Sequence, residues 1–203
     1  MKVSYVNNSE RDGAEFWLRR VQWEPSEVAR EIVRANDPIQ TGLVADIGGA
    51  HGRETFWLAK HGFNSILIEP NLCSLRFAIK RADDTKLTAA LMNAALPYLP
   101  VAAEIVDIAD FYYALHQIPD ELKLASLKEI RRILTPSGTL YSTSFGYWEG
   151  HAMPSSVFPI ATKQEFLGLH ISAGFRPRGI IEERCDGARP YEKYWYGAFQ
   201  KDQ

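Results

Sequence analysis

Apolar residues recur along this chain at two alternating spacings. Short consecutive runs are typical of buried strands, whereas apolar residues at steps of three and four are typical of helices. The runs predict a first strand that ends at residue 45 and three more at 64–68, 87–92 and 104–109. A fifth strand follows a turn at 135–138, and two more lie within 176–200 on either side of a turn at 185–190. The periodic stretches predict helices at 53–61, 72–82, 120–134 and 162–173.

The N-terminal part of the chain is also periodic. Residues 10–36 repeat apolar positions at helical steps, and Pro25 divides this stretch into two helices because proline is accepted at a helix start and disruptive inside one. Residues 146–160 have no period and many turn-forming residues, so they predict a long loop. Together these segments predict one α/β domain, residues 1–203, around a mostly parallel sheet.

Composition and charge narrow the class of protein. The 203 residues are 46% hydrophobic and 24% charged, as in ordinary globular proteins, and the net charge of −2 makes a nucleic-acid partner unexpected. No apolar stretch is long enough to cross a membrane and the N-terminus lacks a signal peptide's apolar region, so we expect a cytoplasmic protein. The histidines and the two cysteines lack metal-ligand spacing, so no metal is expected.

The stretch from Leu43 to Gly52 carries the clearest chemical signal. Asp46 stands at the carboxyl edge of a buried strand, and a cluster of glycines follows, which allows the backbone to turn tightly against a ligand. The spacing does not fit G-x-G-x-x-G, and a carboxylate before the first glycine would repel a pyrophosphate. The ligand predicted for this turn is therefore cationic, such as one with an ammonium and a sulfonium group.

This stretch, D-I-G-G-A-H-G, resembles the D/E-x-G-x-G-x-G motif of class I S-adenosylmethionine-dependent methyltransferases, with Ala50 in place of the middle glycine. Residues 58–71 and 127–145 resemble later segments of the same family. The resemblance implies a doubly wound, Rossmann-like sheet of seven mostly parallel strands in the order 3-2-1-4-5-7-6, with an antiparallel C-terminal hairpin. It also implies S-adenosyl-L-methionine as the cofactor and in-line methyl transfer as the reaction.

The resemblance also assigns cofactor-binding positions. Glu69 stands 23 positions after Asp46, near the spacing at which a βαβ unit places a carboxylate on a ribose. Asn93 would bind the adenine amino group and Met92 would pack on the ring. The full predicted set is Asp46, Gly48, Gly49, Ala50, Gly52, Glu69, Pro70, Met92, Asn93, Asp110 and Phe111.

Residues for the methyl acceptor are less constrained by the motifs. Residues 1–40 are expected to form a lid and 146–160 a substrate-side loop, and the predicted acceptor-binding residues are Trp17, Tyr112, Tyr113, Trp148 and His151. His116 is the candidate catalytic base, since its pKa is near working pH. Core packing, lid packing or a solvated surface remains an alternative interpretation for each of these residues.

Three functions remain open on the sequence. The favoured one is a methyltransferase acting on a small-molecule acceptor. The second is a nicotinamide-dependent oxidoreductase, and the third is a non-catalytic S-adenosylmethionine-binding scaffold, which the alanine at position 50 and the lack of an obvious base leave open. The sequence is compatible with a monomer or a homodimer.

Overall fold

The computed structural model describes residues 25–148, 157–186 and 189–202. Its helices are α2 (Glu27–Ala35), α3 (Arg53–Lys60), α4 (Leu72–Thr85), the 3-10 helix η1 (Leu115–Gln117), α5 (Asp120–Ile133) and α6 (Lys163–Ser172). Its strands are β1 (Val44–Ile47), β2 (Ser65–Ile68), β3 (Ala90–Met92), β4 (Val106–Phe111), β5 (Leu134–Trp148), β6 (Phe175–Pro177), β7 (Glu182–Asp186) and β8 (Arg189–Lys201).

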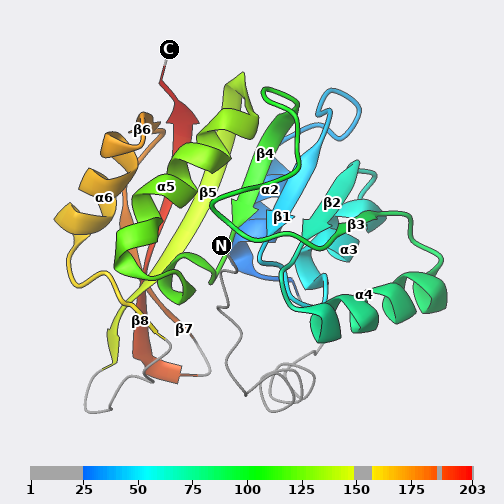
Figure 1. The fold of residues 1–203 in the computed structure, drawn as a ribbon, viewed down its shortest axis with the longest axis horizontal. Helices are drawn as coiled ribbons and strands as arrows, with labels where there is room; N and C mark the ends of the chain where they lie inside the picture. The colour runs from blue at the N-terminus through cyan, green and yellow to red at the C-terminus, as the bar shows by residue number, and fades with distance from the viewer. Residues whose placement is uncertain (1–24, 149–156, 187–188, 203) are drawn as a thin grey trace.

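One sheet forms the centre of the described structure, with the strand order β3-β2-β1-β4-β5-β8-β6 and β7 paired to β8 (Figure 1). The strands from β3 to β5 run parallel, whereas β8 is antiparallel to β5, β6 and β7. The predicted doubly wound α/β fold with an antiparallel C-terminal hairpin is therefore confirmed, and β8 takes the place predicted for the seventh strand.

The C-terminal part differs from the prediction in one detail, because the sheet has eight described strands and not seven. The segment expected to be a single strand before the last turn is two strands. β6 pairs with residues 199–201 of β8, and β7 pairs with residues 189–196 of the same strand. The long strand β8 thus accommodates two short partners in succession along one side.

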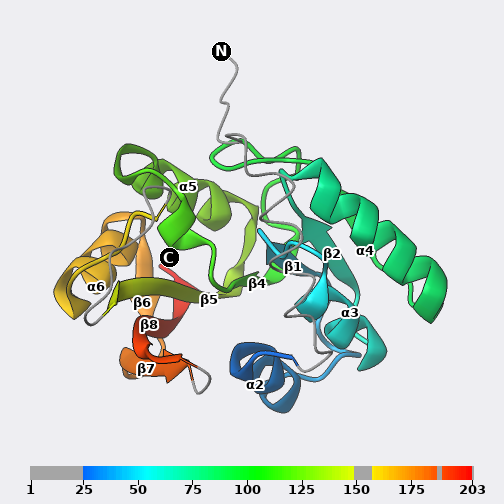
Figure 2. The same ribbon diagram turned by 90° about the horizontal axis from the view of Figure 1, so that it is seen from below.

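Helices cover both faces of the sheet. Figure 2 shows α5 and α6 on one face and α2 and α3 on the other. Ala109 of β4 belongs to the same buried cluster as Leu127 of α5, whereas its neighbour Ile108 packs with Ile32 of α2. Successive residues of β4 therefore point to opposite layers, as the alternation of a strand requires.

Two boundaries differ from the prediction for reasons of pairing. β4 spans Val106–Phe111 and not 104–109, because its pairing with β1 and β5 continues through Asp110. The predicted turn at 135–138 lies within β5, which begins at Leu134, and its register against β4 shifts after the pair Val106 and Leu134. This shift of the strand by two residues places Asp110 within β4, whereas the sequence placed it at the carboxyl edge of the strand.

Side-chain caps fix the starts of α2 and α6. Ser26 caps α2 by accepting a hydrogen bond from the backbone N–H of Ala29. Thr162 and Glu165 form the predicted capping box at the start of α6, with both reciprocal hydrogen bonds at 3.1 Å. The other predicted N-terminal helix lies before residue 25, outside the described residues. No helix in the described ranges is long and apolar enough to cross a membrane.

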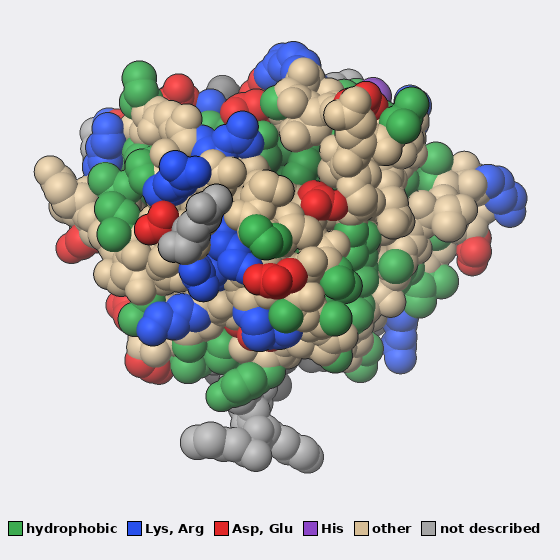
Figure 3. Space-filling model, turned by 90° about the horizontal axis from the view of Figure 1, so that it is seen from above, with side chains coloured by type: hydrophobic (Ala, Val, Ile, Leu, Met, Phe, Trp, Pro, Cys, Tyr) green, Lys and Arg blue, Asp and Glu red, His purple; other side chains and the backbone are tan. Residues whose placement is uncertain are grey.

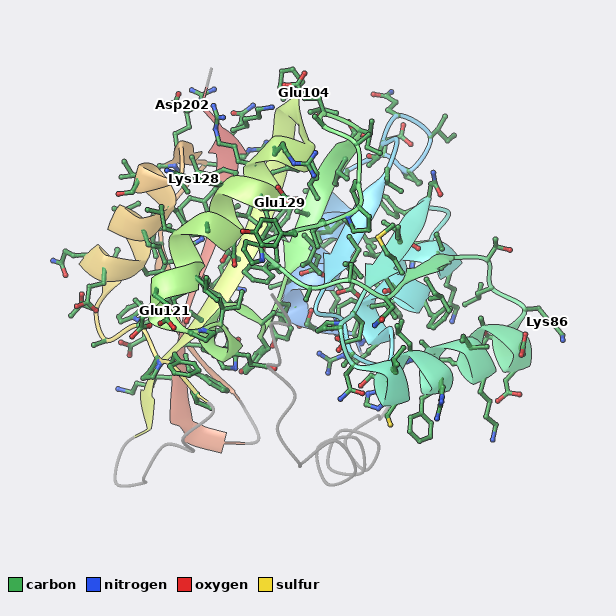
Figure 4. The ribbon with its side chains drawn as sticks, viewed as in Figure 1. Lys86, Glu104, Glu121, Lys128, Glu129 and Asp202 are labelled. Atoms are coloured by element: carbon green, nitrogen blue, oxygen red, sulfur yellow. The ribbon has the colours of Figure 1, made fainter. Side chains whose placement is uncertain are left out.

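Charges of both signs are interspersed at the edge opposite to the carboxyl ends of the parallel strands (Figure 3). Figure 4 shows Glu104 and Asp202 at this edge. Lys201 Nζ lies 2.7 Å from a Glu104 carboxylate oxygen, and Arg131 donates to the backbone carbonyl of Asp202 at 2.8 Å. These contacts attach the end of β8 to its neighbours.

Candidate functional site

The predicted cofactor residues gather at the carboxyl ends of four adjacent parallel strands. Strand register places Ile47 of β1 beside Ile68 of β2, and Ile68 beside Met92 of β3, while Asp46 lies beside Asp110 of β4. Ligands of open α/β sheets bind at this edge. The structure therefore brings together the residues that the sequence placed at separate strand ends.

The turn after β1 depends on left-handed backbone conformations. Gly48, Ala50 and Gly52 have φ angles of 73°, 49° and 72°. Ala50 adopts this conformation in spite of its Cβ, which costs about 1 kcal/mol. The Ala50 N–H donates to a Glu69 carboxylate oxygen at 3.0 Å, and this charge-assisted hydrogen bond offsets the cost. The substitution at the motif's middle glycine is thus accommodated without changing the turn.

Glu69 follows β2 and is 6% exposed. One carboxylate oxygen accepts from Ala50, and the other accepts from the N–H of Asn71 at 2.8 Å. Burial raises the pKa of Glu69, and the two backbone donors oppose that rise. Each carboxylate oxygen can accept a second hydrogen bond, so the held carboxylate has capacity left for the hydroxyls of a sugar.

Asn93 is oriented by the backbone of the same strand end. Its Nδ2 donates to the carbonyls of Glu69 at 3.0 Å and Pro70 at 2.9 Å. These two bonds use both amide hydrogens and leave the side-chain oxygen as the group available to a ligand. An acceptor oxygen suits an exocyclic amino group. Met92, which precedes Asn93, is half-buried at the end of β3.

Asp46 of β1 is held by the first turn of α3. Its Oδ2 accepts hydrogen bonds from the backbone N–H of Thr55 at 3.0 Å and from the Thr55 hydroxyl, and the residue is 2% exposed. Gly49 passes so close that a Cβ there would lie 2.2 Å from the same carboxylate oxygen. Burial, followed by the nearby Glu54 carboxylate, raises the pKa of Asp46 to about 7.

Asp110 is the most unusual polar residue of the site. It is fully buried, and neither carboxylate oxygen has a hydrogen-bond partner among the described residues. Burial, and then the charge of Asp46, raise its pKa well above the ordinary value. Phe111, the next residue, points to the opposite face and packs in the core beneath α5. The two neighbouring predictions on β4 thus occupy different layers.

An ion pair that the sequence analysis did not identify lies beside these carboxylates. Glu54 is 5% exposed and accepts from the backbone N–H of Ser26 at 3.1 Å and from Arg53, whose Nη2 lies 2.7 Å away. Burial opposes ionisation of Arg53, but Glu54 raises its pKa overall. The sequence could have indicated these two residues, because they lie in the first helical turn after the glycine turn. They connect α3 to the start of α2.

Tyr112 and Tyr113 follow β4 and begin an aromatic cluster. Tyr113 has a left-handed φ of 56°, and its N–H donates to the Thr143 hydroxyl at 2.7 Å. Its ring centroid lies 5.0 Å from Phe145 and 5.2 Å from Tyr194, two residues that the sequence did not identify. The strained backbone turns the Tyr113 ring into this cluster, and such strain is concentrated at functional sites.

His116 lies in η1 and is 3% exposed. Its ring centroid is 4.0 Å from that of Phe145, and its Nδ1 has no partner among the described residues. Burial, and then the charge of Lys123, lower its pKa to about 3. A histidine in this environment binds protons weakly, which favours the packing interpretation over that of a general base. Its catalytic role stays a prediction.

The remaining acceptor-side predictions cannot be placed as a group. Trp17 and His151 lie outside the described residues, as do most of the predicted lid and of the predicted loop. Trp148 ends β5, where its backbone pairs with Glu192 of β8. No cluster of histidine, cysteine or acidic residues suited to a metal ion occurs in the described part of the chain.

A separate cavity of about 380 Å³ lies between α2, β7 and β8. Three of its charged lining residues pair with one another, since Arg184 donates to Glu182 at 2.8 Å and lies 3.8 Å from Glu31. The Arg184 guanidinium also stacks over the Tyr196 ring at 3.7 Å. These contacts stabilise the described β7–β8 pair against α2.

The sequence model of the family described as "Methyltransferase domain" matches residues 44–138. This range contains the glycine turn, Glu69, Asn93 and Asp110. Residues 44–138 are thus similar to a methyltransferase domain. This similarity and the solved structures below are consistent with S-adenosylmethionine, the cofactor that the sequence predicted. No curated protein matches the chain.

Solved structures share the fold of this chain over most of its length. A Methanosarcina mazei protein described as a SAM-dependent methyltransferase has a TM-score of 0.72 at 18% identity, covering 84% of this chain and 96% of that one. The Burkholderia thailandensis 1,6-didemethyltoxoflavin-N1-methyltransferase, solved with 1,6-didemethyltoxoflavin and S-adenosylhomocysteine, has a TM-score of 0.71 at 19% identity, covering 96% and 84%. The [4+2]-cyclase SpnF has a TM-score of 0.72 at 14% identity, covering 87% and 80%.

Proposed function

We propose that this protein transfers a methyl group from S-adenosylmethionine to a small-molecule acceptor. The observation that carries the proposal is the arrangement at the β2 end, defined here as Glu69, Asn71 and Asn93. There a carboxylate fixed by two backbone donors lies beside an amide whose oxygen is left free by its own two bonds. This set of acceptors complements the two hydroxyls and the amino group of an adenosine.

The protein's contribution to the reaction is positioning. The bound cofactor supplies an already activated methyl group on a sulfonium, so the chain's residues have to orient the two reactants and exclude water. Glu69 and Asn93 orient the adenosine, and the glycine turn allows the backbone to approach the ligand closely. Alignment of this kind contributes several kcal/mol to the lowering of a barrier.

The acceptor site we assign is the aromatic cluster of Tyr112, Tyr113, Phe145 and Tyr194. Rigid aromatic side chains provide contact area at a low entropic cost, and tyrosines add polar ends. The Arg53 guanidinium lies 5.9 Å from the Tyr112 ring centroid and places a positive charge at the rim of the cluster. We therefore expect a compact acceptor with a flat or apolar body, recognised by ring packing.

The B. thailandensis structure is consistent with this class of acceptor, since 1,6-didemethyltoxoflavin is a small molecule. Fold alone does not decide the reaction, because SpnF is described as a cyclase on the same fold. The scaffold interpretation is thus the second candidate, favoured by the low pKa of His116.

The direct test is turnover. The full chain is incubated with S-adenosylmethionine and a panel of small aromatic, hydroxyl and amine acceptors, and S-adenosylhomocysteine is quantified by mass spectrometry. The proposal predicts multiple turnovers with at least one acceptor, and loss of them in Tyr113→Ala with cofactor binding retained. Cofactor binding without turnover across the panel would favour the scaffold, and NADH binding in place of S-adenosylmethionine would favour the oxidoreductase.

A further inference from the structure

Asp46 and Asp110 form a pair of buried carboxyl groups, here called the acidic pair. They are register partners in the adjacent parallel strands β1 and β4. Residues opposite each other in neighbouring strands project from the same face, so both side chains lie in the layer beneath α2 and α3. Their exposed fractions are 2% and 0%. Bulk water therefore does not solvate the two groups.

The charged groups around the acidic pair leave it with an excess of negative charge. Glu54 and Arg53 of α3 act on both members, and Arg53 is already engaged by Glu54 at 2.7 Å. Tyr141 of β5 is the register partner of Asp110 on the other side, and Glu31 of α2 in turn faces Tyr141. Arg178 also acts on Tyr141, but the only cation that acts directly on both members among the described residues is Arg53, which Glu54 shares.

The two members differ in how they are held. Asp46 accepts two hydrogen bonds from Thr55, whereas both oxygens of Asp110 lack a partner among the described residues. An ionised carboxylate that is buried without donors is strongly destabilised, and two adjacent carboxylates do not ionise together. The pair therefore retains a proton when no other positive charge is present.

We propose that the acidic pair shares a proton in the free protein and releases it to solvent when the positive charge of S-adenosylmethionine binds beside it. This inference rests on the proposed function. S-adenosylmethionine carries a sulfonium and an ammonium group, whereas S-adenosylhomocysteine carries only the ammonium. The acidic pair accordingly favours the charged cofactor over the neutral thioether product and does so more strongly as pH rises. Asp110 is a positioning and specificity residue in this account.

The test measures protons and not activity. Calorimetric titrations of the full chain with S-adenosylmethionine, at one neutral pH in buffers of different ionisation enthalpy, give the number of protons released on binding. We expect release of roughly one proton for S-adenosylmethionine and clearly fewer for S-adenosylhomocysteine. Asp110→Asn, which is isosteric and neutral, should abolish most of the release. Asp107→Asn on the same strand is the control, because Asp107 bonds the Leu43 N–H outside the pair.

The wild-type protein alone provides a second measurement that needs no variant. The ratio of S-adenosylmethionine to S-adenosylhomocysteine affinity should rise several-fold between about pH 6 and about pH 8. Binding of S-adenosylmethionine with no proton release, or with equal release in Asp110→Asn, would overturn this inference and leave the proposed function standing. A wild-type protein that binds neither compound would overturn both.

Discussion

Two buried acidic positions at the same edge of the sheet differ in their surroundings. At the β2 end, Glu69 accepts backbone N–H groups from Ala50 and Asn71, whereas Asp110 of the acidic pair accepts none from the described residues. Backbone donors hold a carboxylate in one orientation and keep it ionised. The β2 end is therefore built to bind neutral hydroxyl and amino groups, and the acidic pair is built to respond to charge.

Removal of the Glu69 carboxylate should have the largest effect on binding. Glu69→Ala deletes the acceptors for the sugar and leaves the N–H groups of Ala50 and Asn71 without their partner. We expect S-adenosylhomocysteine affinity to fall roughly 100-fold, or about 2.7 kcal/mol, by calorimetry. Glu69→Gln keeps one acceptor oxygen and should lose about tenfold. A change of less than threefold in Glu69→Ala would contradict the role given to the β2 end.

A methyl group added at Gly49 should disturb the acidic pair by steric contact with Asp46. The added Cβ would lie 2.2 Å from the Asp46 carboxylate, which cannot move without breaking its bonds to Thr55. Gly49→Ala should lower the free energy of unfolding by about 2 kcal/mol, measured by urea denaturation. Gly179→Ala is the matched control, because a Cβ there meets nothing within 4 Å. Equal stability of the two variants would show that the Asp46 position is not fixed.

Loss of the Asn93 amide should have a smaller effect at the β2 end. Asn93→Ala removes one acceptor for the adenine amino group, and S-adenosylhomocysteine should bind about tenfold more weakly. Asn93→Asp cannot donate to the carbonyls of Glu69 and Pro70, so it should bind more weakly than the alanine variant. An aspartate variant with wild-type affinity would rule out the orientation described for this side chain.

The smallest effect concerns pH. Because the pKa of Asp46 is raised to about 7, the folded protein binds more protons than the unfolded chain between about pH 4 and about pH 7. The contribution of Asp46 to the free energy of unfolding is therefore present at low pH and is lost as pH rises through that range. His116, with a pKa lowered to about 3, contributes with the opposite sign.

The comparison of wild type with Asp110→Asn cancels the contribution of His116. The variant removes the ionisation of Asp110, whose pKa is raised by burial and then by the charge of Asp46, so its free energy of unfolding should fall less with pH. We expect the difference in free energy of unfolding between wild type and Asp110→Asn to change by about 1 kcal/mol between about pH 4 and about pH 7, measured by urea titration of the free protein. Parallel pH profiles of the two proteins would indicate that the two carboxyl groups do not interact.

The fold was readable from the sequence wherever one element's own pattern decides it. The buried run before Asp46 predicted β1, and Thr162 with Glu165 predicted the start of α6. Pairing between distant segments was not readable. The extent of β4 through Asp110 depends on its neighbours β1 and β5, and the division of the C-terminal segment into β6 and β7 depends on the length of β8.

The candidate site was predicted to a similar extent. Motif spacing identified Asp46 and Glu69, but their partners Thr55 and Asn71 follow only from the folded turns. The sequence named Asp110 without indicating that it faces Asp46, because which side chains share a layer depends on register. Phe145 and Tyr194 were missed because β5 and β8 meet only in the sheet.

The central claim is that this edge of the sheet binds an adenosyl sulfonium and not a pyrophosphate. Titration calorimetry of the wild-type chain with S-adenosylmethionine, followed by competition with NADH, tests it most directly. The account predicts a dissociation constant for S-adenosylmethionine on the order of micromolar and no displacement by NADH. Binding of NADH by a protein that does not bind S-adenosylmethionine would contradict it.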